Sequence, residues 1–113
     1  KPPSTIADGL LTSLSELTFT IIRKNADDIL TVTEESIIEC MKLIWERMKI
    51  IIEPSSAVAL AAVREHNELF RGLKTGIILS GGNVELSKLP FTSWALVNEE
   101  RRSPSKVQTC FML

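Results

Sequence analysis

A run of three aliphatic residues that ends in a hydroxyl, two glycines and an amide constrains this chain most. Ile77–Leu79 has no polar alternation, which predicts a short strand buried on both faces of a parallel sheet. Ser80, Gly81, Gly82 and Asn83 follow directly. Ligands of open α/β sheets bind beyond the carboxyl ends of strands, where glycine lets them approach the backbone. The motif indicates either a ligand site or an ordinary tight turn, and residue types alone do not separate the two.

The preceding half of the chain predicts one more strand and a pair of helices. Ile29–Thr33 is rich in β-branched residues, and Thr33 suits the N-cap of a helix whose apolar stripe falls at Ile37, Met41, Ile44 and Met48. Pro54 suits the first turn of a second helix, and Ala57–Val63 is almost wholly apolar, as in a closely packed helix. We therefore expect an α/β fold with an incomplete, mostly parallel sheet and flanking helices.

Composition narrows the class of protein. The chain has 113 residues and a formal net charge of -1, which fits one small globular domain and gives no electrostatic reason to expect nucleic acid or an anionic membrane. Two cysteines are too few to indicate a disulfide framework or a metal cluster, so a cytoplasmic setting is the default expectation. The sequence starts with Lys1 rather than Met, and we expect it to continue a longer chain.

Five short motifs occur in a fixed order: Thr5–Gly9, Asp27–Glu34, Trp45–Lys49, Glu53–Ser55 and Ser80–Val84. Each is weak alone, but the ordered set resembles the serine/threonine dehydratase family of pyridoxal-phosphate enzymes, and its serine racemase branch in particular. The likeness runs from about Thr5 to about Leu86. It implies that residues 1–90 form the C-terminal part of the large cofactor-binding domain of a fold-type II enzyme. Residues 91–113 match poorly and are expected to form a flexible tail.

The resemblance also implies an activity for the complete enzyme. Such enzymes remove the Cα proton of L-serine and then either return a proton, as racemases do, or eliminate water, as dehydratases do. Their cofactor lysine lies in a Ser-x-Lys-x-Arg-Gly motif, which this sequence does not contain. We therefore expect no catalytic residue and no metal ligand in this chain, which would supply one wall of the pocket and be inactive alone. The alternative is a catalytically dead remnant that acts as an interaction or regulatory module.

Four residues are expected at the cofactor. By similarity, Ser80 faces the pyridine nitrogen, Gly9 lines the ring through its backbone, and Gly81 also binds the cofactor. Glu53 is expected to be a buried acid near the cofactor, because Pro54 holds it at a helix junction. A hydroxyl is a neutral partner that can hydrogen-bond an unprotonated ring nitrogen. For Ser80 the competing interpretation is a turn serine that bonds its own backbone. For Glu53 it is a solvated carboxylate, because perturbed acids cluster at functional sites only on average.

The family resemblance further implies a nucleotide contact at a subunit interface. Lys49 and Asn83 match the residues that contact ATP in serine racemases, with Mg²⁺ and ATP as candidate activators and a homodimer as the expected assembly. The alternative for Lys49 is an ordinary surface lysine. Ser55–Ala57 departs from the small Thr-Ala-Gly type of run that often follows Glu-Pro in the family, which leaves the fine shape of the pocket open.

Overall fold

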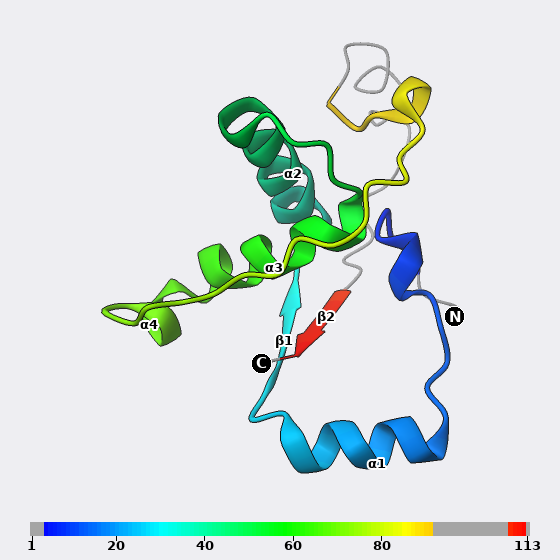
Figure 1. Cartoon of the computed structure of the whole chain (residues 1–113), viewed down its shortest axis with the longest axis vertical. Helices are drawn as coiled ribbons and strands as arrows, with labels where there is room; N and C mark the ends of the chain where they lie inside the picture. Colours follow the sequence, from blue (N-terminus) through cyan, green and yellow to red (C-terminus); the bar gives the residue numbers. More distant parts are fainter. Residues whose placement is uncertain (1–3, 92–108, 113) are drawn as a thin grey trace.

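The computed structural model of the chain describes residues 4–91 and the backbone of residues 109–112 (Figure 1). Its elements follow one another as η1 (Asp8–Leu10), α1 (Glu16–Asn25), β1 (Ile29–Val32), α2 (Glu34–Met48), α3 (Pro54–Glu65), α4 (Asn67–Phe70), η2 (Leu86–Lys88) and β2 (Thr109–Met112). Helices α2 and α3 pack against each other, and β1 lies against α3. The core forms where these three elements meet.

Helix α2 begins at the predicted cap, and most of its predicted apolar stripe is buried. The Thr33 hydroxyl accepts a hydrogen bond from the Ser36 N–H at 3.3 Å, which satisfies one free donor of the first turn. The buried stripe consists of Ile37, Cys40, Met41 and Ile44. Met48 was expected in this stripe but is 57% exposed. It is the last helical residue, and the chain turns away at Lys49 in the left-handed conformation, with a φ of 60°.

Helix α3 is buried on several sides, as its small apolar residues predict. Its fully or nearly buried residues are Ser56, Ala57, Val58, Ala59, Ala61 and Ala62. Small side chains let α2 and β1 approach its backbone closely. The connection that leads into it is fixed by Trp45, whose indole N–H donates to the Ile52 carbonyl at 3.0 Å and whose ring meets Phe91 edge-on at 5.5 Å.

The sheet differs from the expected one. Strand β1 confirms the strand predicted at 29–33, but it pairs antiparallel with β2, with Ile29 opposite Met112 and Val32 opposite Thr109. Four residues of the expected tail thus form a strand, whereas residues 92–108 lie outside the described residues. The mostly parallel sheet is not confirmed.

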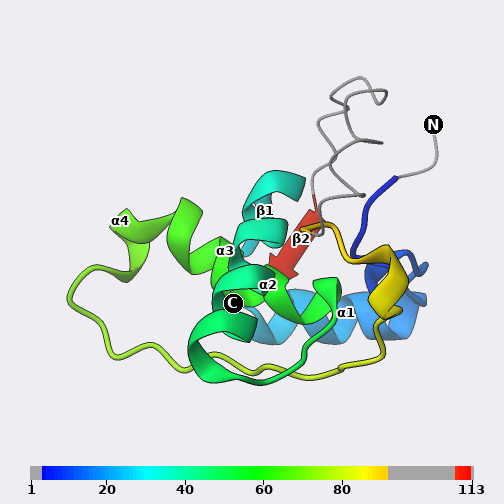
Figure 2. The same ribbon diagram turned by 90° about the horizontal axis from the view of Figure 1, so that it is seen from above.

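The strand predicted at Ile77–Leu79 is absent. The segment between α4 and η2 runs back along the molecule in an extended path (Figures 1 and 2), and Ile78 is 83% exposed. A strand exists only where a neighbour completes its hydrogen bonds. Within the described part of the chain, β1 and β2 pair with each other and neither lies in register with this segment. The prediction of a strand at Ile77–Leu79 was therefore wrong, because within the described residues no neighbouring strand pairs with this segment.

Helix α1 lies apart from the α2–α3 pair in Figure 1. Ser15 caps it, accepting a hydrogen bond from the Thr18 N–H at 3.2 Å. Its apolar side chains remain largely open, with Leu17 72% and Ile21 54% exposed. Within residues 4–91 and 109–112, no helix combines the length and the apolar character that crossing a membrane requires.

Candidate functional site

The turn between α2 and α3 places Glu53 at the centre of the candidate site. Glu53 is the N-cap residue of α3, yet its side chain makes no capping hydrogen bond, and Pro54 occupies the first turn. The carboxylate instead turns toward the glycine motif. The Glu53 N–H donates to the Gly81 carbonyl at 3.2 Å, and Glu53 Oε2 accepts from the Asn83 N–H at 3.2 Å. Two hydrogen bonds therefore tie the 81–83 segment to the start of α3.

Gly81 has to be glycine at this position. Its φ is +86°, and a Cβ built there would lie 2.6 Å from both Cδ and Oε1 of Glu53. The carboxylate thus fills the space that a side chain at Gly81 would need. At Gly82 a Cβ would lie 2.9 Å from the Ile51 carbonyl oxygen. The sequence suggested that these glycines admit a ligand; in the structure they admit the 51–53 segment of the same chain.

Gly9 also contacts the turn between α2 and α3. Its N–H donates to Ser55 Oγ at 3.1 Å, and a Cβ on Gly9 would lie 2.8 Å from that oxygen and 3.6 Å from Glu53 Oε1. Glu53 Oε1 therefore lies close to both Gly9 and Gly81. Three segments that are far apart in the sequence meet here. The structure brings together Gly9, Glu53 and Gly81, while their contact with a cofactor stays a prediction.

Ser80 and the two expected nucleotide contacts are exposed. Within the described residues the Ser80 hydroxyl has no hydrogen-bond partner, so it does not form the turn-serine bond of the competing interpretation. The Asn83 backbone N–H is taken by Glu53, and its side chain is open to solvent. Lys49 ends α2 and has an exposed side chain. No hydrogen bond or ion pair joins Lys49 to Asn83 in the part of the chain that the structure describes.

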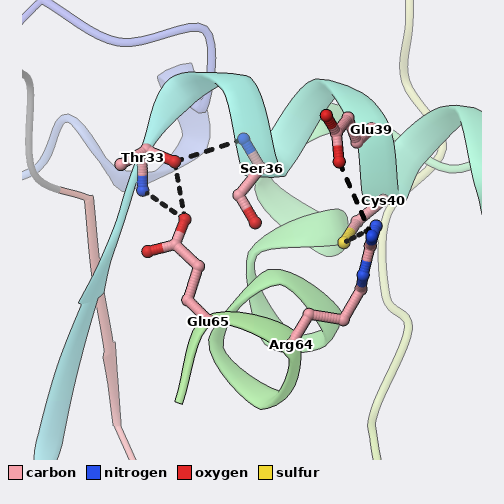
Figure 3. A network of polar contacts seen from close by, with 6 residues as sticks. All are labelled: Thr33, Ser36, Glu39, Cys40, Arg64 and Glu65. Carbon is pink, nitrogen blue, oxygen red and sulfur yellow. Dashed lines mark hydrogen bonds and ion pairs between the residues drawn. The ribbon is translucent and has the colours of Figure 1, made fainter. Parts of the chain in front are cut away.

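A second polar network joins the end of α3 to the start of α2 (Figure 3). Glu65 Oε1 accepts from the Thr33 N–H at 2.9 Å and from the Thr33 hydroxyl at 2.6 Å. Burial, the largest single influence, raises the pKa of the Glu65 carboxyl, but the hydrogen bonds from Thr33, together with Ser36 and the neighbouring His66, hold that pKa below its usual range. Beside it, His66 Nε2 lies 2.9 Å from the Thr31 carbonyl oxygen. Sequence reasoning found the Thr33 cap but not this second attachment.

The same network contains the buried Cys40. Arg64 donates to Cys40 Sγ at 3.6 Å and forms an ion pair with Glu39 at 3.6 Å (Figure 3). Burial raises the pKa of the Cys40 thiol, which favours the neutral form. A neutral thiol is a poor nucleophile and a poor metal ligand. We therefore assign these residues to holding α2 against α3 and not to chemistry.

Within the described residues, two other kinds of site can be compared with the glycine turn: a surface hollow and a metal cluster. A shallow hollow of about 250 Å³ is lined by Phe19, Thr20, Arg23 and Lys24, all on α1 and none among the predicted site residues. Among the residues that the structure describes, no three His, Cys, Asp or Glu side chains are grouped so that they could hold a metal ion. Ser55 was overlooked as a site residue. Its only sequence signal was that the Ser55–Ala57 run departs from the family's run after Glu-Pro.

Comparison with known proteins identifies the family. Residues 1–81 match the family described as "Pyridoxal-phosphate dependent enzyme". The chain is 57% identical over 89 residues to a serine racemase of Dictyostelium discoideum, which covers 77% of this chain and 28% of that protein. It is 45% identical over 89 residues to a beta-hydroxyaspartate dehydratase of Paracoccus denitrificans, with 79% of this chain and 28% of that protein covered.

Solved structures agree with this result. The crystal structure of the Dictyostelium discoideum serine racemase superposes with a TM-score of 0.68 at 58% identity, covering 74% of this chain and 28% of that one. A maize serine racemase structure also gives a TM-score of 0.68, at 38% identity, covering 86% of this chain and 30% of that one. The chain thus spans less than a third of the length of the relatives that it matches. Since the family match covers most of its residues, the chain belongs to the pyridoxal-phosphate dependent enzyme family.

Proposed function

We propose that this chain supplies the pyridine-side wall of the pocket in a pyridoxal-phosphate enzyme that racemises or dehydrates L-serine. The observation that carries the proposal is the convergence of three motifs, at Gly9, Glu53 and Gly81, on one turn. Relatives named as a serine racemase and a hydroxyaspartate dehydratase support a small hydroxy amino acid as the substrate class.

The residues at this turn fit the cofactor. Ser80 precedes the clamped Gly81, and its exposed hydroxyl has no partner in the described part of the chain. A hydroxyl can bond an unprotonated ring nitrogen without imposing a charge. At Gly9 and Gly81 the absence of a Cβ lets Ser55 and Glu53 pack directly on the backbone, which holds both segments of the proposed wall in place. When bound, pyridoxal phosphate supplies an electron-withdrawing ring that eases loss of the substrate's Cα proton.

The chain's own residues would orient this ring and keep it in place. Glu53 holds the loop that carries Ser80 through the Gly81 carbonyl and the Asn83 N–H, so the hydroxyl projects from a segment that is attached to α3 directly after it. Because Ser80 is neutral, it leaves the ring nitrogen free of an ionic partner. That environment favours a moderate electron demand, suited to elimination or prompt reprotonation.

We further propose that Lys49 and Asn83 contact ATP, with Mg²⁺ bound outside this chain, in a cytoplasmic homodimer. The exposed side chains of both residues and the family resemblance support this. An ammonium group can pair with phosphate oxygens as a point charge, and an amide can donate to them.

The second candidate is a catalytically dead interaction module. The observation that favours it is the open apolar surface, for example Leu17 on α1 and Ile78 in the extended segment, together with the lack of a Ser-x-Lys-x-Arg-Gly motif in the sequence. A partner that covered these side chains would remove their apolar surface from water.

A chimera separates the two functions. The matching segment of the Dictyostelium discoideum serine racemase is replaced by residues 5–86 of this chain, and cofactor absorbance, thermal stability and L-serine turnover are measured. We expect the chimera to hold the cofactor and to turn over serine. A chimera that folds as stably as the parent but retains no cofactor would refute the wall function. The isolated chain should show no turnover, and cofactor-dependent turnover by it would equally contradict the proposal.

A further inference from the structure

The first turn of α3 carries two neighbouring serines with opposite surroundings. Ser55 Oγ accepts the Gly9 N–H at 3.1 Å, across 46 residues of sequence. Ser56 is 5% exposed, and its hydroxyl has no hydrogen-bond partner within the described residues. The two side chains share their chemistry and their helix, so they form a matched pair.

The backbone at Gly9 is held by Ser55 in addition to the hydrogen bonds of its own turn. In the η1 turn, the Leu10 and Leu11 N–H groups donate to the Ala7 and Asp8 carbonyls at 2.9 and 3.0 Å. The Gly9 N–H takes no part in these bonds, and in the described part of the chain it donates to Ser55. Ala7 is fully buried and anchors the turn. Without the Ser55 hydroxyl the Gly9 N–H would lose its partner within the described residues, and the peptide unit between Asp8 and Gly9 would be held only by the hydrogen bond from the Leu11 N–H to the Asp8 carbonyl.

Both glycine backbones are thus attached to the same element, the start of α3. Ser55 holds Gly9, and Glu53, two residues earlier, holds Gly81 through its N–H. Pro54 lies between them and restricts the backbone, and α3 continues into the buried core. The separation between the Gly9 and Gly81 loops is therefore fixed by three consecutive residues, Glu53 to Ser55.

We propose that Ser55 is a positioning residue of the cofactor wall, whose hydroxyl orients the Gly9 backbone against the ring while Glu53 does the same for the Gly81 loop. This inference rests on the proposed function. It gives a role to the serine that replaces the threonine often found in the family's run after Glu-Pro. A threonine would keep the same oxygen, so the role predicts that Thr can substitute and Ala cannot.

The test compares Ser55→Ala, Ser55→Thr and Ser56→Ala in the chimera. We expect Ser55→Ala to weaken pyridoxal-phosphate affinity about two- to fivefold, the effect of losing one solvent-accessible hydrogen bond. The Gly9 amide should exchange with solvent several-fold faster in the same variant, measured without cofactor. Ser55→Thr should restore both values, and Ser56→Ala should leave both unchanged.

The outcomes separate this inference from the proposed function. Faster exchange at Gly9 with unchanged cofactor affinity in an active chimera would overturn the positioning role and leave the wall function standing. Unchanged exchange at Gly9 in Ser55→Ala would overturn the clamp itself. A folded chimera that binds no cofactor in any variant would overturn the wall function, and the role of Ser55 with it.

Discussion

Replacing Gly81 by alanine tests the geometry of the candidate site most sharply. Gly81 has a φ of +86°, and a Cβ there would lie 2.6 Å from Cδ and Oε1 of Glu53. The backbone conformation alone costs a non-glycine residue about 1–2 kcal/mol. Moving the carboxylate aside would also weaken its hydrogen bond with the Asn83 N–H, which at this exposed position is worth about 1 kcal/mol. We expect Gly81→Ala to lower the free energy of unfolding by about 2–3 kcal/mol.

Gly72 provides the matched control. It has a similar φ of +81°, but a Cβ there would meet nothing within 4 Å. Gly72→Ala should therefore show the conformational cost alone, about 1–2 kcal/mol. The difference between the two variants measures the contact with Glu53. Both are measured by urea unfolding followed by far-ultraviolet circular dichroism.

A double-mutant cycle isolates the same contact. Shortening Glu53 to alanine removes the carboxylate from the space at Gly81, so Gly81→Ala should cost less in the Glu53→Ala background than in the parent. The residual cost should approach that of Gly72→Ala. Equal costs for Gly81→Ala in both backgrounds, or for Gly81→Ala and Gly72→Ala in the parent, would refute the packing of Glu53 against Gly81.

Three further predictions concern other parts of the structure. Ser56→Ala should leave the free energy of unfolding unchanged or raise it by up to about 1 kcal/mol, because a buried hydroxyl without a partner is costly; a clear loss in urea unfolding would show that the hydroxyl is paired. Glu65→Gln should cost no more than about 1 kcal/mol at neutral pH. The pKa of Glu65 is depressed in the folded protein, so its carboxylate contributes stability above the unfolded pKa of about 4.3, and this contribution is lost as the pH falls through the folded value. Glu65→Gln should therefore make the free energy of unfolding less dependent on pH in the acid range. A pH dependence equal to that of the parent would contradict this. Deleting residues 109–113 should speed amide exchange along β1, since β2 pairs with it, and unchanged exchange by mass spectrometry would argue against that pairing.

Local features of the fold could be predicted from the sequence. The Thr33 cap and the stripe from Ile37 to Ile44 follow from side chains within a few residues of one another, and the structure confirms both. The strand at Ile77–Leu79 could not be judged in this way, because a strand depends on a neighbour elsewhere in the chain. The antiparallel partner of β1 came instead from the last residues of the chain, where the pattern predicted only a tail.

The sequence predicted that three of the candidate site residues lie together, but not the contacts that hold them. Motif order identified Gly9, Glu53 and Gly81, which do lie together. The reason for glycine at Gly81, a carboxylate from 28 residues earlier, is a tertiary contact with no local signal. The bond from Gly9 to Ser55 was missed for the same reason, since a serine in the first turn of a helix ordinarily serves its own backbone.

The central claim is that Ser80 faces the ring nitrogen of the cofactor. The direct measurement is the absorption spectrum and L-serine turnover of the chimera carrying Ser80→Asp, with Ser13→Asp, at an exposed serine of the segment before α1, as the control for added charge. An aspartate beside the ring would favour the protonated nitrogen by about 1.4 kcal/mol for each unit of raised pKa. We predict a shifted cofactor band and at least about a tenfold loss of turnover for Ser80→Asp only, because a ring that withdraws electrons too strongly over-stabilises the deprotonated substrate and slows its onward reaction. A spectrum and turnover equal to those of the parent chimera would show that Ser80 does not touch the cofactor, and the proposed wall would be wrong.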